Sequence, residues 1–568
     1  MKTPRNDHAA SRPLRGDPPR RGRTEPKGRQ VTASALDAVA ALLGETVTRR
    51  DLLIEHLHAI QDRYGEISAA HLAALAELMR LAQAEVFEVA SFYAHFDIVK
   101  EGDPPVAPVT IRVCDSLSCC MAGAEDLLAS IESNVPEWVR VLRAPCVGLC
   151  DRAPAIAVGH HFIAPATVAH ALEAVAADET HPVIPPYPGY DAYLAGGGYT
   201  LLGQVRDGSL AAETILAALD RAGLRGLGGA GFPTGRKWRS VLAQPGPRLM
   251  AVNADEGEPG TFKDRRHILA DPHRFLEGAL IAAHIVEAAT VVIYLRDEYP
   301  EAREILTREI ARLPAGGPDI DLRRGAGAYI GGEESAMLES IEGKRGLPRH
   351  KPPFPFQSGL FGRPTLINNV ETLWWVRDIL ERGPDWWTSH GRNGRTGLRS
   401  YSVSGRVREP GVKLAPAGIT ARELITEFCG GMADGHVFTA YLPGGASGGI
   451  LPEAMADIPL DFGTLEPHGC LIGSAAVIVL SGHDDVRAAA LNLMRFFEAE
   501  SCGQCTPCRA GTQKARMLME RPVWDQALLD ELAAAMRDAS ICGLGQAAPI
   551  PVQTVMRYFP HLFAETVS

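Results

Sequence analysis

The 568-residue chain lacks any uninterrupted apolar run of the length that crosses a bilayer, so we expect no direct membrane insertion. It is also poor in cysteine, and eleven residues in this length are too few for a disulfide scaffold. No internal repeat is evident in the sequence. With 46% hydrophobic and 22% charged residues, the composition is that of a globular protein. Several domains are expected, because a single hydrophobic core stops growing well before this length.

Only the first thirty residues carry a strong excess of positive charge. Residues 1–30 carry nine Lys/Arg against three acids, and we predict a disordered basic tail there. A solvated or partner-docking tail is the simpler interpretation than one that binds nucleic acid. The chain as a whole has a formal net charge of −11, so its body is acidic, which argues against nucleic-acid binding. The tail lacks the apolar segment of a secretory signal, and we expect a cytoplasmic protein.

Nine of the eleven cysteines fall into two clusters, which favours metal binding over disulfide formation. The second cluster consists of Cys502, Cys505 and Cys508 at x2 spacings, with Cys542 further along the chain. This pattern is typical of a [4Fe–4S] site, because three neighbouring thiolates meet one face of a cubane and a distant fourth closes it. A structural zinc site is the alternative interpretation, since four thiolates also suit zinc.

The first cluster consists of two separated pairs, Cys114 with Cys119 and Cys146 with Cys150. Two pairs suit a [2Fe–2S] cluster, in which each iron takes two thiolates. Zinc is again the alternative, although x4 and x3 spacings are less usual for it. Adjacent side chains cannot easily bind one cluster together, so we select Cys119 as the ligand and expect Cys120 to be a packed thiol.

The pattern of apolar residues and turn residues predicts a multidomain protein of α/β and α modules. Along the chain we expect the basic tail (1–30), a helical bundle (31–105), a compact α/β module (106–180), a Pro-, Gly- and Tyr-rich linker (181–200), an open-sheet α/β domain (201–394), a β-rich or α+β insert (395–480) and a helical domain (481–568).

Several elements are specific enough to be predicted individually. Ser68 is a candidate helix N-cap, and residues 84–96 form a helix that ends in aromatic residues. Strands are predicted at residues 249–253 and 290–295, with an apolar helix at 272–288 between them, which is a βαβ-like pattern. The cysteines of the second cluster are placed in a loop between two helices.

Three polar loops interrupted by glycine indicate a ligand crevice in the open-sheet domain. They are residues 226–238, 253–260 and 325–334. The first lets backbone N–H groups approach a phosphate, with Lys237 adding positive charge, although it is neither a GxGxxG fingerprint nor a Walker loop. A solvated acidic face would not explain why the acids recur beside glycine turns. The crevice suits a flavin, which needs a phosphate cradle, polar groups at the ring edge and an open ring face.

These motifs together resemble the flavin and iron–sulfur diaphorase module shared by respiratory complex I, NAD-reducing hydrogenases and NAD-dependent formate dehydrogenases. Residues 35–175 are similar to the complex I 24 kDa subunit in the motifs IQDRYG, AEVFEVASFYAHF, CDSLSCCMAG and CVGLCDRAP. Residues 190–568 are similar to the 51 kDa subunit in GLGGAGFPTGRKW, NADEGEPGTFKDR, GAYIGGEES, KPPFP, NNVET, PGGASGG and ESCGQCTPCRAGT. The fusion of both in one chain looks most like the beta subunit of a tungsten- or molybdenum-dependent formate dehydrogenase.

The resemblance implies a fold and cofactors. It implies a thioredoxin-like [2Fe–2S] domain after the N-terminal helical bundle, a Rossmann-like domain for FMN and NADH, a ubiquitin-like (SLBB) insert, and a C-terminal helical bundle with a [4Fe–4S] cluster. The implied [2Fe–2S] ligands are Cys114, Cys119, Cys146 and Cys150. The implied [4Fe–4S] ligands are Cys502, Cys505, Cys508 and Cys542.

The resemblance also implies roles for residues of the crevice. Gly226, Gly228 and Lys237 would hold the FMN phosphate. The rest of the flavin site would be lined by Asn253, Asp255, Tyr329, Gly332, Glu333, Asn368, Asn369 and Thr372. The dinucleotide would contact Glu258, Lys351, Phe232 and Phe354, the phenylalanines by stacking on adenine. Glu334 would lie near the flavin and the nicotinamide, so Glu258 and Glu334 are the catalytic candidates.

The expected function is electron transfer between NAD(H), FMN and iron–sulfur clusters, within the overall reaction formate + NAD⁺ = CO₂ + NADH. No stretch of the chain looks like a molybdopterin or nickel site, so the centre that oxidises the substrate is expected in a partner. We expect a catalytic alpha subunit that carries a Mo- or W-pterin and further iron–sulfur clusters. The alternatives are the diaphorase subunit of an NAD-reducing hydrogenase and a fused NADH dehydrogenase module of complex I. A non-catalytic scaffold that uses zinc for structure is the alternative from another class.

Overall fold

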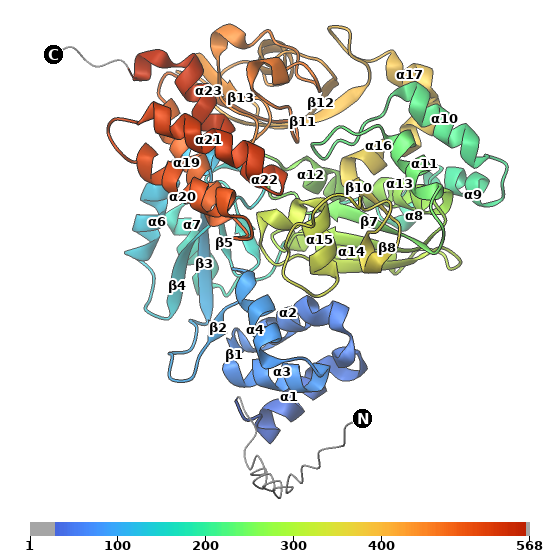
Figure 1. The fold of residues 1–568 in the computed structure, drawn as a ribbon, viewed down its shortest axis with the longest axis vertical. Coiled ribbons are helices and arrows are strands. Elements are labelled where there is room, and N and C mark those ends of the chain that lie inside the picture. Colours follow the sequence, from blue (N-terminus) through green and yellow to red (C-terminus); the bar gives the residue numbers. More distant parts are fainter. Residues whose placement is uncertain (1–28, 564–568) are drawn as a thin grey trace, which may run out of the picture.

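The computed structural model describes residues 29–563, in which helical and α/β modules follow one another along the chain (Figure 1). Most of the basic tail predicted for residues 1–30 therefore lies outside the described residues. In Figure 1 the N-terminal helices lie at one end of the molecule, and the insert and the C-terminal helices lie at the other. Among the described residues, no helix combines the length and the apolar character needed to cross a bilayer.

The N-terminal helices pack around one apolar core. They are α1 (Ala33–Leu43), α2 (Leu53–Tyr64), α3 (Ala69–Met79) and α4 (Gln83–Phe92). The predicted N-cap is confirmed, because the Ser68 side chain accepts a hydrogen bond from the His71 amide at 3.1 Å. The predicted extent of the last helix, 84–96, is wrong. Tyr93 leaves the helix with φ −97° and ψ 116°, and its buried hydroxyl donates to the Lys344 carbonyl at 2.9 Å.

The second module is a four-stranded sheet with the order β4-β3-β5-β6 and three helices. Its strands are β3 (Val109–Cys114), β4 (Val139–Ala144), β5 (Ile156–Val158) and β6 (His161–Ile163). Its helices are α5 (Leu117–Met121), α6 (Ala124–Glu132) and α7 (Val168–Ala176). Cys114, the first cysteine of the first cluster, is the last residue of β3 and so lies at the carboxyl end of a central strand. A further short parallel pair, β1 (Ile67–Ser68) and β2 (Ile98–Val99), precedes this module.

The tyrosine-rich segment 181–200 is anchored to the module that follows it. The hydroxyl of Tyr187 donates to Glu309 at 2.9 Å, and the hydroxyl of Tyr193, in α8 (Tyr190–Ala195), donates to Glu277 at 2.6 Å. Because Tyr193 and Glu277 are both buried, this contact is part of the core. The segment therefore docks on helices of the next domain.

The central domain is a parallel sheet with the order β10-β7-β8-β9 covered by helices. Its strands are β7 (Arg248–Ala254), β8 (Ala288–Leu295), β9 (Asp319–Arg324) and β10 (Thr365–Asn369). Its helices are α9 (Thr200–Arg206), α10 (Ala212–Ala222), α11 (Thr234–Leu242), α12 (Lys263–Ala270), α13 (Pro272–Ile285), α14 (Pro300–Ile310), α15 (Glu334–Ile341), α16 (Val370–Arg382) and α17 (Pro384–Thr388).

Both predicted strands of this domain are confirmed, and the predicted helix is confirmed except at its end. The helix stops at Ile285 because Glu287 turns with a positive φ of 53° into β8, which begins at Ala288. In the sheet, Asn369 is in register with Asn253. The second glycine loop, which follows β7, therefore begins beside Asn369 at the carboxyl end of β10.

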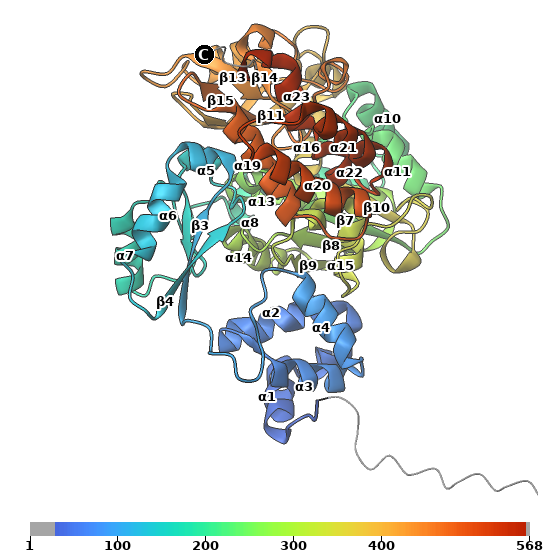
Figure 2. The same ribbon diagram turned by 60° about the vertical axis from the view of Figure 1, so that its left-hand side comes forward.

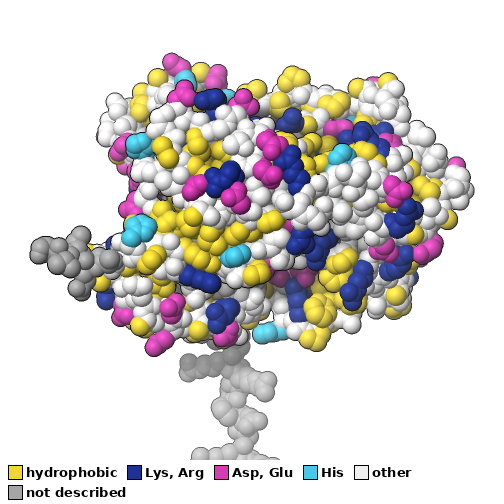
Figure 3. Space-filling view, turned by 90° about the horizontal axis from the view of Figure 1, so that it is seen from above, with side chains coloured by type: hydrophobic (Ala, Val, Ile, Leu, Met, Phe, Trp, Pro, Cys, Tyr) yellow, Lys and Arg dark blue, Asp and Glu magenta, His cyan; other side chains and the backbone are white. Residues whose placement is uncertain are grey.

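The insert is a mixed five-stranded sheet with the order β12-β11-β15-β13-β14. Its strands are β11 (Leu398–Gly405), β12 (Gly411–Pro416), β13 (Phe438–Leu442), β14 (Leu451–Pro452) and β15 (Ala476–Ser481), with one short helix, α18 (Ala421–Glu423). Viewed from above, Lys/Arg and Asp/Glu side chains are interspersed with apolar ones over this end of the molecule (Figure 3).

The C-terminal module is helical and lies against the central domain and the second module (Figure 2). Its helices are α19 (Val486–Ala499), α20 (Thr506–Met519), α21 (Gln526–Ala539), α22 (Gly543–Ala547) and α23 (Ile550–Tyr558). The prediction that the triplet of cysteines lies in a loop between helices holds for Cys502 and Cys505. It is wrong for Cys508, which lies in the first turn of α20.

Candidate functional site

A cavity of about 320 Å³ opens at the carboxyl ends of β7 and β10. All three glycine-rich loops reach its wall, the first through Gly228, Gly229 and Ala230. The insert contributes Ser447, Leu471, Gly473 and Ser474, and the C-terminal module contributes Gly543, Leu544 and Ala547. The crevice predicted from the three loops therefore exists, and two further modules close it.

Half of the residues expected at the crevice lie in the wall of this cavity. They are Gly228, Asn253, Asp255, Glu258, Tyr329, Gly332, Glu333 and Asn369. The wall is packed so closely that a side chain larger than that of glycine would not fit at some positions in or beside it. A side chain at Gly331 would place its Cβ 2.4 Å from Asp255 Oδ2, and one at Gly228 would meet Asn369 Cβ at 3.0 Å. Backbone without side chains leaves room for a phosphate or a flat ring, so the wall fits a flavin nucleotide.

The other half of the expected residues do not line the cavity, and four of them hold the first glycine loop in place. Thr372 accepts a hydrogen bond from the Leu227 amide at 2.8 Å, and the Gly226 amide donates to the Phe232 carbonyl at 2.8 Å. Two further bonds tie the helix after the loop to β10. Asn368 accepts from the Trp238 ring at 2.9 Å, and Lys237 donates to the Ile367 carbonyl at 3.1 Å.

The remaining expected residues, Phe232, Glu334, Lys351 and Phe354, lie outside the wall. Lys351 Nζ bonds Glu334 at 2.6 Å and Glu333 at 3.1 Å, which links it to the third glycine loop. Phe232 and Phe354 are 40% and 44% exposed, so each has ring surface free to stack on a ligand.

Both carboxylate oxygens of Glu258, in the wall, accept hydrogen bonds. Its Oε1 accepts hydrogen bonds from the amide and the hydroxyl of Ser447 at 2.7 and 2.8 Å, and its Oε2 accepts a short hydrogen bond from the Tyr329 hydroxyl. Burial raises the pKa of the Glu258 carboxyl, and these three donors oppose the rise. Burial also raises the pKa of Asp255 to about 8. Ser447 lies in the PGGASGG motif, but its contact with Glu258 spans 189 residues and no sequence pattern reveals it.

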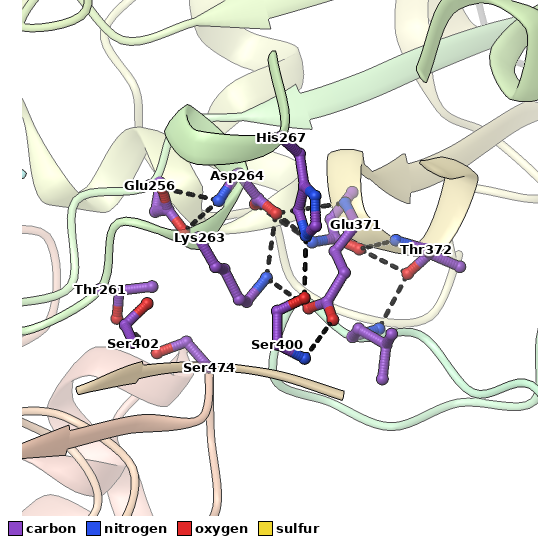
Figure 4. Close-up of polar contacts among 12 residues, drawn as sticks. Glu256, Thr261, Lys263, Asp264, His267, Glu371, Thr372, Ser400, Ser402 and Ser474 are labelled. Atoms are coloured by element: carbon purple, nitrogen blue, oxygen red, sulfur yellow. Dashed lines mark hydrogen bonds and ion pairs between the residues drawn. The ribbon is translucent and has the colours of Figure 1, made fainter. Parts of the chain in front are cut away.

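A buried ion network beside the cavity was not predicted (Figure 4). Lys263 Nζ lies 3.0 Å from Asp264 Oδ1 and 3.0 Å from Glu371 Oε2, and Lys263 is only 1% exposed. Burial alone would lower the pKa of Lys263, but Asp264 and Glu371 raise it above its usual value. Glu256 accepts from the Asp264 amide at 2.9 Å. The lysine that reaches the cavity wall is therefore Lys263, whereas Lys237 is bonded to the backbone of β10.

The four sulfurs selected for the first cluster meet in one buried place. Cys146 Sγ and Cys150 Sγ are 3.2 Å apart, and the thiol of Cys114 interacts with both Cys119 and Cys146. Hydrogen bonds from Cys114 and Cys150 lower the pKa of Cys146. Cys120 points elsewhere, because its Sγ donates to the Asp115 carbonyl at 3.0 Å. Four converging thiols fit a two-iron cluster.

The cysteines of the first cluster pack against the segment that follows the second glycine loop. Buried Phe262 packs on Cys146 and Cys150. Arg296 connects the two sides, since its guanidinium donates to the Cys146 carbonyl at 2.8 Å and to the Glu256 carbonyl at 2.7 Å.

The second group of cysteines forms part of the core of the C-terminal module. Cys508 is buried and the other three are partly buried, and burial raises the pKa of Cys508 to about 11 and that of Cys542 to about 12. A side chain at Gly545 would bring its Cβ within 2.8 Å of Cys508 Cβ, so α22 packs closely on the start of α20. The two residues after Cys542 line the flavin-sized cavity. Three thiols at the start of α20 and a fourth at the start of α22, which packs on it, fit a cubane that would border that cavity.

Three family models match the chain. The thioredoxin-like [2Fe-2S] ferredoxin model matches residues 39–178, the Nuo51 FMN-binding domain matches residues 219–378, and the NADH-ubiquinone oxidoreductase-F iron-sulfur binding region matches residues 488–566. The chain therefore carries FMN, a [2Fe–2S] cluster and a [4Fe–4S] cluster, with NAD as the substrate dinucleotide. The zinc alternatives for the two cysteine clusters are set aside by these matches.

Curated relatives match the second part of the chain. The mitochondrial NADH dehydrogenase [ubiquinone] flavoprotein 1 of Dictyostelium discoideum is 40% identical over 370 residues, which are 61% of this chain and 77% of that protein. The mitochondrial NADH-ubiquinone oxidoreductase 51 kDa subunit of Neurospora crassa is 40% identical over 372 residues, covering 61% of this chain and 76% of that protein. A solved structure covers both parts. The crystal structure of NAD+-reducing [NiFe]-hydrogenase in the H2-reduced state has a TM-score of 0.78 at 32% identity, over 91% of this chain and 92% of that one.

The fold and the site thus define an NADH dehydrogenase-type flavin and iron–sulfur oxidoreductase. Within that class, the chain belongs to the family of the complex I 51 kDa flavoprotein. It carries a 24 kDa-type thioredoxin-like [2Fe–2S] module fused ahead of the flavoprotein part.

Proposed function

We propose that this chain is the diaphorase (beta) subunit of a cytoplasmic NAD-dependent formate dehydrogenase, with the overall reaction formate + NAD⁺ = CO₂ + NADH. Its partner would be an alpha subunit that carries the Mo- or W-pterin and further iron–sulfur clusters. The family supplies the NAD/FMN electron-transfer activity. The formate specificity is our inference from the fusion of the two parts in one chain.

One observation carries the electron-transfer role. The cavity at the ends of β7 and β10 is bordered by Gly543 and Leu544, which directly follow the cysteine that closes the second cluster. A flavin in this cavity would therefore be a neighbour of the [4Fe–4S] cluster. On the other side of the cavity, the segment 253–262 lines the wall with its first residues. Its last residue, Phe262, packs on Cys146 and Cys150.

We assign the flavin site to the residues of the cavity wall and to those that hold the glycine loop. FMN, when bound, exchanges a hydride with NAD(H) and single electrons with the clusters. Within the wall, Tyr329 and Ser447 fix the carboxylate of Glu258 so that it faces the cavity in one orientation. The remaining flavin contacts are proposed for Gly226, Gly228, Lys237, Asn253, Asp255, Gly332, Glu333, Asn368, Asn369 and Thr372.

The dinucleotide is proposed to bind where Lys351 meets Glu334. Phe232 and Phe354 have exposed faces that could stack on adenine. Lys351 would exchange its bonds to Glu333 and Glu334 for a bond to the ligand, which frees those carboxylates for the nicotinamide end. We further propose that the clustered cysteines other than Cys120 are the eight ligands of the iron–sulfur clusters. We also propose that the five-stranded insert is the ubiquitin-like domain expected from the resemblance.

The variant Cys505→Ser tests the electron route. It removes a proposed ligand of the cluster beside the cavity, so NADH should still bleach the flavin absorbance while formate-dependent NAD⁺ reduction, assayed with the catalytic partner, falls at least a hundredfold. Stopped-flow flavin absorbance and the paired assay measure the two steps separately. Cys120→Ser is the matched control and should leave both unchanged, because that thiol bonds the Asp115 carbonyl. Undiminished onward transfer in Cys505→Ser would refute the route.

A second candidate is the diaphorase subunit of an NAD-reducing hydrogenase. The solved hydrogenase chain matches both the [2Fe–2S] part and the flavoprotein part of this chain, which favours it over a single complex I subunit. A fused complex I module is the third candidate. The co-purifying partner distinguishes them, since molybdenum or tungsten with formate activity, nickel with hydrogen activity, and a quinone-linked membrane arm each identify one assembly.

A further inference from the structure

Away from the flavin cavity, three side chains meet where the N-terminal helices contact the central domain. His58 lies on α2, His95 follows α4, and Asp297 follows β8. One potential ligand atom from each lies within 4.8 Å of those of the other two. The two imidazole rings are 4.9 Å apart at an angle of 52°, so they neither stack nor share a hydrogen bond.

Hydrogen bonding determines which nitrogen of His58 carries the proton. His58 Nε2 lies 2.9 Å from the Gly325 carbonyl, which can only accept, so Nε2 is the N–H and Nδ1 holds the lone pair. His95 Nδ1 lies 3.2 Å from Asp297 Oδ2, close to the roughly 3.4 Å that separates two ligands of one zinc ion. Both His58 Nδ1 and His95 Nε2 are buried and have no hydrogen-bond partner. The buried lone pair of His58 Nδ1 is therefore unsatisfied, which native proteins rarely tolerate.

This arrangement matches that of metal-binding histidines. A histidine that binds a metal almost always donates its other ring N–H to a carboxylate or to a backbone carbonyl. The Gly325 carbonyl fills this position for His58. Burial lowers the pKa of both imidazoles, so they are in the neutral form that binds metals.

We propose that His58, His95 and Asp297 form a binding site for a divalent transition-metal cation of the zinc class. Imidazole with one carboxylate suits zinc and its neighbours, whereas Mg²⁺ and Ca²⁺ prefer oxygen ligands throughout. The two carboxylate oxygens of Asp297 have different partners. Its Oδ1 receives Arg324 and lies 3.8 Å from Arg303, while Oδ2 faces the histidines.

The ion would have access and a free position. His95 and Asp297 line a cavity of about 890 Å³ between the [2Fe–2S] module and α19, through which an ion and a water molecule can arrive. Zinc ligands at about 2.1 Å stand roughly 3.4 Å from one another in a tetrahedral site. Because the three ligand atoms lie within 4.8 Å of one another, binding would draw α2 and the loop after β8 together by at most about 1 Å.

Metal analysis of the full-length chain with its clusters in place tests the proposal. After incubation with Zn²⁺ and gel filtration, zinc and iron are measured in the same sample. About one zinc per chain should be retained in addition to the cluster iron. His58→Gln and His95→Gln should lose that zinc and keep the iron. His56→Gln is the matched control, because His56 is buried on the same helix but bonds the Thr46 carbonyl, and it should keep both.

Thermal unfolding guards against variants that merely misfold. Zn²⁺ should raise the Tm of the wild type and of His56→Gln, and should leave the Tm of the two site variants unchanged. The proposal is overturned if the wild type keeps no zinc, or if His58→Gln and His95→Gln keep as much as the wild type. Zinc gained at the expense of iron would place it in the cysteine clusters and would equally overturn it. The iron content reports on the electron-transfer role separately, so a failure of one proposal leaves the other standing.

Discussion

At the level of single residues, buried carboxyl groups in and near the cavity at the ends of β7 and β10 make the stability of the protein depend on pH. Burial raises the pKa of Asp255 to about 8, and burial raises those of Glu256 and Glu500 to about 7. Between the usual pKa of an acid, about 4, and these values, the folded state binds more protons than the unfolded state. The stability that these three carboxyl groups contribute therefore falls as the pH rises from about 4 to 8.

Asp255→Asn should flatten this dependence. An amide cannot lose the proton that costs the folded wild type its stability, so the variant should lose less stability between pH 6 and pH 8. The difference in slope is at most about 1.4 kcal/mol per pH unit, the value for one proton. Urea unfolding of the FMN-free chain across this range measures it. Asp434→Asn, at an acid whose side chain is 95% exposed, is the control, and equal slopes in all three proteins would contradict the prediction.

Phe354→Ala should weaken the binding of the dinucleotide and leave FMN binding unchanged. Loss of one stacking contact costs about 0.5–1.5 kcal/mol, which corresponds to a roughly two- to tenfold higher KM for NADH. The kcat and the FMN content should not change, because Phe354 lies outside the cavity wall. Steady-state kinetics with an artificial electron acceptor measures both constants. Phe87→Ala removes an equally exposed ring from α4 and should have no effect on KM.

Residue types could be predicted from the sequence better than residue contacts. The cysteine groups and the glycine loops were found because their spacing is local. Lys263 was not assigned to the site, because its meaning depends on Glu371, more than a hundred residues away in sequence. Lys237, the cation expected at the phosphate, donates to the Ile367 carbonyl, and nothing local in its loop indicates that bond.

At the level of secondary structure, the core of the central domain depends on one close helix crossing. A side chain at Gly278 of α13 would bring its Cβ within 2.0 Å of the Leu373 carbonyl of α16. Backbone cannot move away as a flexible side chain can, so the helices would have to separate.

Gly278→Ala should therefore lower the free energy of unfolding by about 1–3 kcal/mol, the usual cost of overpacking. Chemical denaturation of the wild type and the variant measures the change. Gly203→Ala is the control in α9, where an added Cβ meets nothing within 4 Å and alanine is the better helix former. It should leave stability equal or higher. A neutral Gly278→Ala would mean that the crossing can relax.

Helices and strands with a regular pattern of apolar residues could be predicted, but the residues at which they end could be predicted less well. Strands β7 and β8 and helix α13 follow directly from apolar patterns. The end of α4 did not, because Tyr93 leaves the helix to reach a carbonyl 251 residues away. The segment 181–200 looks like a linker by composition, yet its tyrosines find buried acids on α13 and α14. Long-range hydrogen bonds of this kind leave no periodic trace in the sequence.

At the level of the whole molecule, Arg296 joins the [2Fe–2S] module to the flavin domain. It is buried, bonds carbonyls on both sides and pairs with Glu298 at 3.1 Å. Arg296→Met should lower the free energy of unfolding by about 3–5 kcal/mol, as breaking a buried ion pair does. It should also alter the EPR signal of the [2Fe–2S] cluster, because Arg296 bonds the Cys146 carbonyl. Arg495→Met breaks an exposed pair with Glu520 and should cost less than about 1 kcal/mol. Equal costs would show that Arg296 does not join the modules.

The anchored tyrosine segment has a consequence for how the two redox modules stay together. Separate polypeptides meet according to their affinity and drift apart on dilution, whereas a short tether holds its two ends at an effective concentration in the millimolar range. Here the tether is itself fixed to α13 and α14, so little of its length is free to let the modules part. Every flavin is thereby supplied with one [2Fe–2S] centre, in the same ratio in a crowded cell and in a nanomolar assay.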